Sequence, residues 1–247
     1  MKDTKVIGII PARLGSKRFP NKAIYELEGK PLFLWPAQEA QKCKSIDKVI
    51  VATNSEEIAE IAKKNDVEVF LNQTKCSCGT ERIAEYASID DSGDYFLNIQ
   101  ADEVLIQDWM LDLLIERAIE LESKMATIIT PIFDDSELDD KNTVKVVCNR
   151  GSDALYFSRA AIPFSRHLHS QYRKHIGIYF YDRDVLAHYD QKIISQLEYA
   201  ESLEQLRALE NGFKIHCINI DQAAELVSVN ARNDIPRIID ILNNKID

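Results

Sequence analysis

The chain has 247 residues, of which 45% are hydrophobic and 28% charged, and this composition suits one large globular domain. Its formal net charge of -10 argues against non-specific binding to nucleic acid or to an anionic membrane surface. Its five cysteines do not resemble a secreted disulfide framework, and neither a signal peptide nor a membrane-length apolar stretch is evident, so the sequence predicts a cytoplasmic protein without membrane insertion.

In the first half of the chain, short apolar runs alternate with longer segments of helical periodicity. The runs predicted as buried strands are Val6–Ile10, Lys48–Ala52, Val67–Leu71 and Tyr95–Ile99. The segments predicted as helices are Pro31–Cys43, Ser55–Asn65, a stretch that starts at Gly79, and Asp108–Ser123. This alternation predicts an α/β fold with a mostly parallel, Rossmann-like sheet flanked by helices, in which ligands bind where the strands end.

The alternation weakens after Thr130. Three further strands are predicted, at Val144–Cys148, Leu155–Phe157 and Ile176–Tyr181, while the acidic stretch Asp134–Asp140 is interpreted as a loop. Helices at Ser202–Glu210 and about Asp234–Asn243 complete the pattern. We therefore expect a single domain over residues 1–247, in which about residues 130–190 form a smaller, more antiparallel subdomain.

The loop after the first predicted strand concentrates positive charge in a chain that is acidic overall. Arg13, Lys17, Arg18 and Lys22 place four cations within ten residues, and Gly15 lets backbone N–H groups approach an anion closely. Such a density of cations after a buried strand suits a triphosphate. The glycine spacing fits neither a Walker loop nor a dinucleotide fingerprint, and a solvated basic loop is the alternative interpretation.

A pair of carboxylates follows the fourth predicted strand. Asp102 and Glu103 come directly after the strand that ends at Ile99, so they are expected at the same edge of the sheet as the basic loop. Carboxylate oxygens are usual ligands of the hard cation that nucleotidyl transfer requires. The alternative is that these two residues only cap the helix that follows.

The basic loop also carries the first part of a family resemblance. Together with Gly29-Lys30-Pro31, it resembles the opening of the 3-deoxy-manno-octulosonate (Kdo) cytidylyltransferases, or CMP-Kdo synthetases, in its sequence Pro11-Ala12-Arg13-Leu14-Gly15-Ser16-Lys17-Arg18-Phe19-Pro20-Asn21-Lys22. In that family the loop wraps the phosphates of CTP. The resemblance implies these nucleotide-binding residues: Pro11, Ala12, Arg13, Gly15, Ser16, Arg18 and Lys22. It also implies that Arg13 and Lys22 act in catalysis.

The acidic turn is similar to the Gln-Gly-Asp-Glu-Pro turn of the same family, with Ala101 and Val104 as departures. The resemblance implies that Asp102 is catalytic and holds Mg²⁺. A second metal-binding Asp of the family corresponds here to Asn230, whose neutral carbonyl oxygen binds a hard cation more weakly.

Four further stretches resemble family segments that contact the sugar. They are Gly79-Thr80-Glu81-Arg82, the run from Tyr156 to Phe164, His175-Ile176-Gly177-Ile178-Tyr179, and Ser202-Leu203-Glu204-Gln205-Leu206-Arg207. The substrate-binding residues that the resemblance implies are Arg82, Gln100, Arg159, His175, Tyr179, Glu204 and Gln205. Taken singly, each has an ordinary alternative, such as a structural histidine or an exposed helix face. Cys76 and Cys78 lack the second pair that a zinc site needs.

The resemblance implies that the chain joins CTP to an acidic sugar, a 3-deoxy-2-ulosonic acid such as Kdo, and releases pyrophosphate. It also implies a homodimer formed through the less regular half. Departures at Asn54, Ala101, Val104 and Asn230 leave open a paralogue that activates another acidic sugar of a surface glycan. A nucleotide-binding relative that has lost catalysis is the alternative from a different class.

Overall fold

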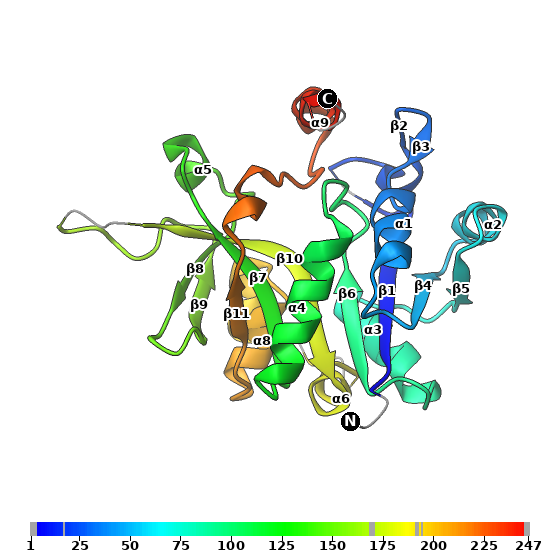
Figure 1. Cartoon of the computed structure of the whole chain (residues 1–247), viewed down its shortest axis with the longest axis horizontal. Coiled ribbons are helices and arrows are strands. Elements are labelled where there is room, and N and C mark those ends of the chain that lie inside the picture. Colours follow the sequence, from blue (N-terminus) through cyan, green and yellow to red (C-terminus); the bar gives the residue numbers. More distant parts are fainter. Residues whose placement is uncertain (1–3, 17, 168–170, 191–192, 194, 245–247) are drawn as a thin grey trace.

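The computed structural model of the protein describes residues 4–16, 18–167, 171–190, 193 and 195–244. Within these residues a nine-stranded sheet has the order β11-β7-β10-β6-β1-β4-β5, with β8 paired to β10 and β9 paired to β8 (Figure 1). The strands are β1 (Val6–Ala12), β4 (Lys48–Thr53), β5 (Glu68–Leu71), β6 (Tyr95–Ile99), β7 (Met125–Pro131), β8 (Lys145–Cys148), β9 (Ala154–Ser158), β10 (Arg173–Asp182) and β11 (His216–Asn219). A separate two-stranded sheet joins β2 (Glu26–Leu27) and β3 (Lys30–Pro31).

The predicted fold class is confirmed. Strand β1 pairs in parallel with β4 and β6, and β4 pairs in parallel with β5. Strand β10 is antiparallel to β6, β7 and β8, and β8 is antiparallel to β9, so the antiparallel pairing gathers in the second half as expected. The antiparallel strands nevertheless continue the main sheet through β10, which lies between β6 and β7.

Helices cover both faces of the sheet because successive strand residues point to opposite sides. Val6 and Ile10 of β1 belong to one apolar core, and Ile7 and Ile9 belong to the other. The first core packs against α1 (Leu34–Lys42), α2 (Glu56–Lys64), α4 (Asp108–Glu120) and α9 (Ile235–Asn244). The second packs against α3 (Gly79–Ile89), α6 (Arg183–Asp190) and α8 (Gln205–Glu210). The helices on the two faces hold the strands in place, and with them the loops that follow the strand ends.

Three parts of the second half differ from the sequence-based expectations. Strands β7 and β11 were not predicted; all seven residues of β7 are buried, so the sequence there lacks the alternation of a half-exposed strand. The stretch predicted as an acidic loop contains the short helix α5 (Asp135–Asp139), and the Asp134 side chain accepts a hydrogen bond from Ser136 N at its start. The helix predicted to begin at Ser202 begins at Gln205 instead, and Ser202 is the C-cap residue of the preceding helix, α7 (Gln196–Glu201).

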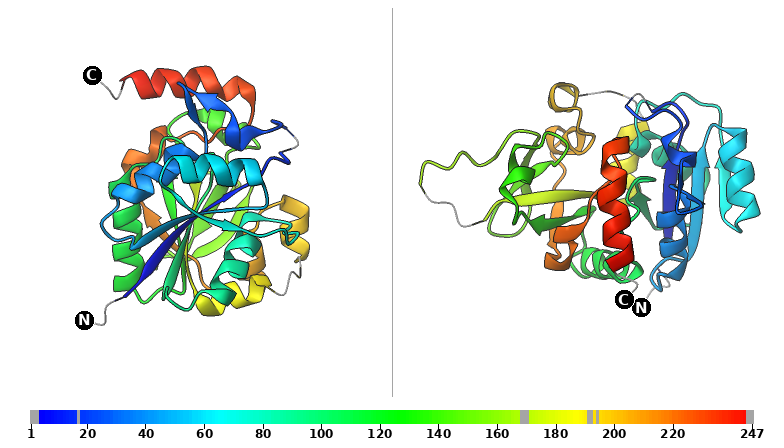
Figure 2. Two further views of the ribbon diagram at one scale, coloured as in Figure 1. Left: turned by 90° about the vertical axis from the view of Figure 1, so that its right-hand side faces the viewer. Right: turned by 90° about the horizontal axis from the view of Figure 1, so that it is seen from above.

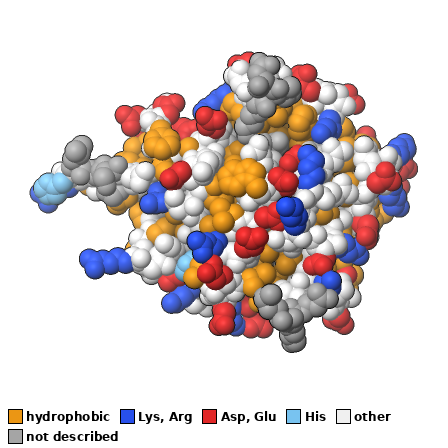
Figure 3. All heavy atoms as spheres, in the orientation of Figure 1, with side chains coloured by type: hydrophobic (Ala, Val, Ile, Leu, Met, Phe, Trp, Pro, Cys, Tyr) orange, Lys and Arg blue, Asp and Glu red, His pale blue; other side chains and the backbone are white. Residues whose placement is uncertain are grey.

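The carboxyl ends of the parallel strands lie along the upper edge of the sheet in Figure 1, where α9 crosses above them (Figure 2). The connections between these elements contain short 3-10 helices at Lys22–Ile24, Asp221–Glu225 and Arg232–Asp234. The face drawn in Figure 3 mixes acidic and basic side chains rather than gathering one sign of charge. Among the described residues, no helix is both long and apolar enough to cross a membrane.

Candidate active site

A cavity of about 780 Å³ opens at the carboxyl ends of β1 and β6, and we call it the main cavity. Every site residue predicted from the sequence lines it: Pro11, Ala12, Arg13, Gly15, Ser16, Arg18, Lys22, Arg82, Gln100, Asp102, Arg159, His175, Tyr179, Glu204, Gln205 and Asn230. These residues are spread over more than 200 positions of sequence, so the fold brings together parts of the chain that only the tertiary structure connects. Lys17 lies outside the described residues.

Residues 11–22, which we call the phosphate loop, are shaped by one buried aromatic side chain. Pro11 and Ala12, predicted as loop, are the last residues of β1. Phe19 is buried and packs edge-on against Tyr25, with ring centroids 5.0 Å apart. Arg13 and Arg18 remain exposed beside the main cavity. The loop is therefore anchored from below and presents its charged side chains to the cavity.

Lys22 and Asp102 form an ion pair inside the main cavity. The Lys22 ammonium donates to Asp102 Oδ2 at 2.5 Å and to the carbonyl oxygen of Val229 at 3.0 Å. The backbone N–H of Val229 in turn donates to the carbonyl oxygen of Asp102 at 3.1 Å. The phosphate loop, the turn after β6 and the segment before α9 are thereby tied together at one point.

Arg18 makes a second link between the same parts of the fold. Its guanidinium donates to Asn142 Oδ1 at 2.5 Å and to Asn230 Oδ1 at 3.2 Å. The Asn230 carbonyl oxygen, the atom predicted as a weak metal ligand, is therefore directed at Arg18. Asp234 Oδ2 accepts from the backbone N–H groups of Asn230 and Ala231, so Asp234 caps the turn that leads into α9.

Glu103 was predicted at this edge of the sheet together with Asp102, but the resemblance gave it no role of its own. It is buried in the cavity wall, where Oε1 accepts from Ser228 Oγ at 2.7 Å. Burial, and then the neighbouring Asp102 carboxylate, raise the pKa of Glu103 to about 7. Helix α4 has Gln107 as its N-cap residue, so the alternative that Asp102 and Glu103 cap that helix is wrong.

The donor set suits a cation that takes most of its ligands from phosphate and water. Among the described residues, no group of three or more His, Cys, Asp and Glu side chains is arranged to hold a metal ion. Mg²⁺ commonly binds through one or two carboxylates and completes its octahedron with substrate phosphates and water. The Asp102 carboxylate already holds a cation, the Lys22 ammonium, which shows that this position is built for positive charge.

Elsewhere in the wall of the main cavity, two guanidinium groups are bound by backbone carbonyls. Arg82 is buried and donates to the carbonyl oxygens of Asn72 and Thr74 at 3.1 and 3.4 Å. Arg159 donates to three carbonyl oxygens, those of Lys141, Glu201 and Ser202, at 2.7, 2.8 and 3.2 Å. Both residues therefore fasten loops of the cavity wall in addition to lining it.

Glu204 caps a helix that is far away in the sequence. Its carboxylate accepts from the backbone N–H groups of Gly79 and Thr80 at 3.3 and 3.1 Å, and from Thr80 Oγ1 at 2.7 Å. These are the first residues of α3, whose own N-cap residue, Cys78, makes no side-chain capping bond. Glu204 thus accepts from free amides at the N-terminus of α3, and its negative charge interacts favourably with the helix dipole.

His175 is held as a neutral acceptor. Its side chain is half-buried at the cavity wall, and desolvation of the ring there lowers its pKa to about 3. Thr127 Oγ1 lies 3.0 Å from His175 Nε2 and gives its single proton to the carbonyl oxygen of Ile178 at 2.7 Å. The hydroxyl oxygen must therefore accept from Nε2–H, which leaves Nδ1 of His175 with a free lone pair.

Gln205 presents an unsatisfied donor to the same region. Only 2% of the residue is exposed, and its Nε2 has no hydrogen-bond acceptor among the described residues. Buried amide groups are nearly always paired in native proteins, so an unpaired one at a cavity wall indicates a ligand acceptor. Tyr179 lies beside His175, with ring centroids 5.1 Å apart, and is also buried.

Comparison with known proteins agrees with this geometry. The sequence model of a protein family described as Cytidylyltransferase matches residues 7–215. A 3-deoxy-manno-octulosonate cytidylyltransferase of Chlorobium limicola is 43% identical over 215 residues, covering 85% of this chain and 87% of the relative. One of Chlorobium phaeobacteroides is 39% identical and covers 97% of this chain and 98% of the relative.

Solved structures show the same relationship. A CMP:2-keto-3-deoxy-manno-octonic acid synthetase complexed with CTP superposes with a TM-score of 0.90 at 31% identity, over 98% of this chain and 100% of that one. A 4-diphosphocytidyl-2C-methyl-D-erythritol synthase from Anaerococcus prevotii shares the fold, with a TM-score of 0.64 at 14% identity, over 97% and 99% of the two chains.

Proposed function

This chain belongs to the Kdo cytidylyltransferase family, and we propose that it transfers the cytidylyl group of CTP to Kdo, giving CMP-Kdo and pyrophosphate. The observation that carries this conclusion is the convergence of all the sequence-predicted site residues on the main cavity. A decayed nucleotide-binding relative has no reason to keep the basic loop, the acidic turn and the sugar-side residues in one cavity.

The reaction needs little covalent chemistry from the protein. The anomeric hydroxyl of Kdo loses its proton to solvent as its oxygen forms a bond to the α-phosphorus of CTP, and the bond from that phosphorus to the pyrophosphate oxygen breaks. Arg13, Arg18 and Lys22 supply positive charge to the triphosphate and to the departing pyrophosphate. Their place at the carboxyl end of β1 supports this assignment.

The sugar binds among polar groups of the cavity wall outside the phosphate loop. Nδ1 of His175 accepts from a sugar hydroxyl, and the unpaired Nε2 of Gln205 donates to a sugar oxygen. Arg82 and Arg159 give positive charge to the side that receives the sugar carboxylate. Because most of these groups are already fixed by the fold, they orient the sugar at low entropic cost.

Mg²⁺ is the proposed cofactor. Asp102 would hold it, with the Asn230 carbonyl oxygen as a weaker, neutral neighbour, and the ion would supply neutralisation of phosphate charge. The fit rests on the exposed edge of the Asp102 carboxylate in the cavity and on the cation that this carboxylate already binds.

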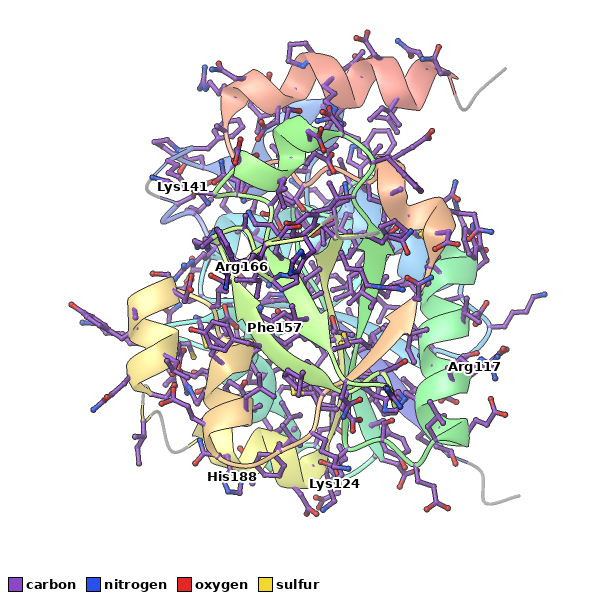
Figure 4. All side chains as sticks on the ribbon, turned by 90° about the vertical axis from the view of Figure 1, so that its left-hand side faces the viewer. Arg117, Lys124, Lys141, Phe157, Arg166 and His188 are labelled. Atoms are coloured by element: carbon purple, nitrogen blue, oxygen red, sulfur yellow. The ribbon has the colours of Figure 1, made fainter. Side chains whose placement is uncertain are left out.

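A homodimer and a cytoplasmic location complete the proposal. Strand β9 pairs only with β8 among the described strands, and Leu155 on β9 is 61% exposed. Phe133 and Phe164, which belong to the same half of the chain, are also exposed. Figure 4 looks onto this end of the sheet, with Phe157 labelled on β9. An exposed apolar side chain on an edge strand, with further exposed aromatic residues in the same half of the chain, supports an interface with a second copy. The use of CTP supports a cytoplasmic location.

The test is pyrophosphate release from CTP, measured with Kdo and with a panel of other acidic sugars, each with and without Mg²⁺. We expect release that requires both Kdo and the metal. Release with another sugar but not with Kdo would establish the paralogue that the departures at Asn54, Ala101, Val104 and Asn230 leave open. The absence of release with every sugar would contradict the proposed function.

A further inference from the structure

The ion pair between Lys22 and Asp102 joins two residues to which the proposed function gives separate tasks. Lys22 is to bind the triphosphate, and Asp102 is to hold a divalent cation. In the structure their charged atoms are 2.5 Å apart, so the Asp102 carboxylate is already neutralised by the chain's own ammonium group. A divalent cation brought to the same carboxylate would lie against this ammonium, and two like charges so close repel strongly.

We propose that Lys22 is a resident cation of the Asp102 site in the nucleotide-free enzyme, and that the triphosphate must draw Lys22 away before a divalent cation binds. This inference rests on the proposed function, which supplies the triphosphate and the metal. It gives the enzyme a fixed sequence of events: the nucleotide phosphates take over the ammonium, the carboxylate becomes available, and the divalent cation then replaces the charge that Lys22 has withdrawn.

The contacts of Lys22 suit a group that changes partner. An ammonium has three N–H donors, and Lys22 uses two of them among the described residues, toward Asp102 and the carbonyl oxygen of Val229. The side chains of Lys22 and Asp102 are 19% and 16% exposed, and both line the main cavity. A phosphate in the cavity can therefore reach Lys22 without any rearrangement of the core.

A second lysine shows how a permanently paired ammonium is built in the same fold. Lys174 donates to Glu137 Oε2 and to the carbonyl oxygens of Ala224 and Leu226, at 2.8, 2.8 and 3.3 Å. All three of its donors are used, and its side chain is only 5% exposed. Lys174 does not line the main cavity. The two lysines thus differ in unused donors, in exposure and in access to the main cavity. These features decide whether a ligand can draw the ammonium away from its carboxylate.

Within the part of the chain that the structure describes, no second cation pairs with Asp102. Arg18 is bound to the neutral side chains of Asn142 and Asn230. Glu103 is buried behind the turn and accepts from Ser228. Removal of Lys22 should therefore free the Asp102 carboxylate, whereas removal of Arg18 should not.

The experiment measures Mn²⁺ binding to the nucleotide-free protein by counting free Mn²⁺ with electron paramagnetic resonance. We expect weak binding by the wild type and by Lys22→Arg, which keeps the charge. Lys22→Met and Lys22→Gln should each bind Mn²⁺ roughly tenfold more tightly, in the usual range of coupling between two sites. Arg18→Met should bind as the wild type does. In the double variant with Lys22→Met and Asp102→Asn, the tighter binding of Mn²⁺ should disappear, and this result would place the ion at Asp102.

The proposal fails if Lys22→Met and Lys22→Gln bind Mn²⁺ no more tightly than the wild type while their thermal unfolding matches that of the wild type. It also fails if Arg18→Met tightens binding equally, because then only the net charge of the cavity matters. No sugar and no turnover enter this measurement. A failure of the proposed function would appear instead as missing pyrophosphate release by the wild type, so the two failures are distinguishable.

Discussion

The phosphate loop with Asp102, here called the phosphate side, and the wall residues proposed to bind the sugar, here called the sugar side, use the same kinds of charged side chain in different ways. On the phosphate side, Arg13 and Arg18 are exposed, and Lys22 has a partner that a ligand can replace. On the sugar side, Arg82 is buried and bound to backbone carbonyl oxygens, and Arg207, which supports this wall from α8 without lining the cavity, is buried and paired with Glu81. The difference teaches that one side is made to rearrange around a ligand, while the other is fixed before the ligand arrives.

The largest effect is expected on stability, from the sugar side. Arg207 is 1% exposed and pairs with Glu81 at 3.1 Å and Glu198 at 2.6 Å. Arg207→Met leaves two buried carboxylates without their cation, so we expect the free energy of unfolding to fall by about 3 to 5 kcal/mol. Urea denaturation measures this change. Arg117→Met, which removes an exposed pair with Glu120, is the matched control and should change it by about 1 kcal/mol or less. Equal effects of the two variants would contradict a preformed sugar side.

The next effect is on catalysis, from the phosphate side. Lys22→Met removes a cation from the triphosphate, and we expect kcat to fall by about 10² to 10³-fold, as when one donor to developing charge is lost. Because Lys22 is only partly buried, thermal unfolding should change little. Lys42→Met removes an equally short ion pair, between the exposed Lys42 and Glu39 on α1, and should leave kcat unchanged. If Lys22→Met lost much stability but kept a normal kcat, Lys22 would be a structural residue of the fold, like Arg207, rather than a residue that binds the triphosphate.

A smaller effect should appear when the pH is lowered. Burial keeps His175 neutral in the folded protein, with a pKa of about 3 against 6.5 in the unfolded chain. The unfolded chain therefore binds a proton below pH 6.5 that the folded protein does not, and stability falls as the pH falls. Between pH 6.5 and 4.5 this loss amounts to about 2 to 3 kcal/mol. Urea denaturation at the two pH values should show a smaller loss for His175→Gln, and no such difference for His188→Gln, which alters an exposed residue.

The smallest effect is expected at Asn230. Because its carbonyl oxygen accepts from the exposed Arg18, the new carboxylate of Asn230→Asp should pair with Arg18. Exposed ion pairs contribute about 1 kcal/mol or less, so kcat/KM should change by less than about fivefold. Pyrophosphate release at varied Mg²⁺ measures this. A larger gain together with a lower Mg²⁺ requirement would show that position 230 faces the metal instead.

Much of the phosphate side was predictable because its signals are local. A cluster of cations after an apolar run, and two carboxylates after another, are visible in the sequence and depend only on where parallel strands end. The parallel sheet and the helices on both its faces follow from the same local patterns. The assignment to CTP and Kdo came from the family resemblance, which residue patterns alone do not supply.

The arrangement of the sugar side was less predictable, because its contacts run between distant segments and often use the backbone. Carbonyl oxygens that bind Arg82 and Arg159 leave no signature in the sequence. The cap that Glu204 provides for α3 spans 125 positions from Gly79. Strand β7 was missed for a related reason, since a strand buried on both faces shows no alternation of apolar and polar residues.

The capping of α3 by Glu204 also allows the opening of this part of the cavity wall to be measured. The amide protons of Gly79 and Thr80 are bonded to a carboxylate from another part of the chain rather than to their own helix. Their exchange with deuterated solvent therefore records how often the segment around residue 204 detaches from α3, and not the fraying of the helix alone. Slow exchange at both amides in the free enzyme, compared with rapid exchange in Glu204→Gln, would measure the opening of this wall directly, residue by residue and without any substrate.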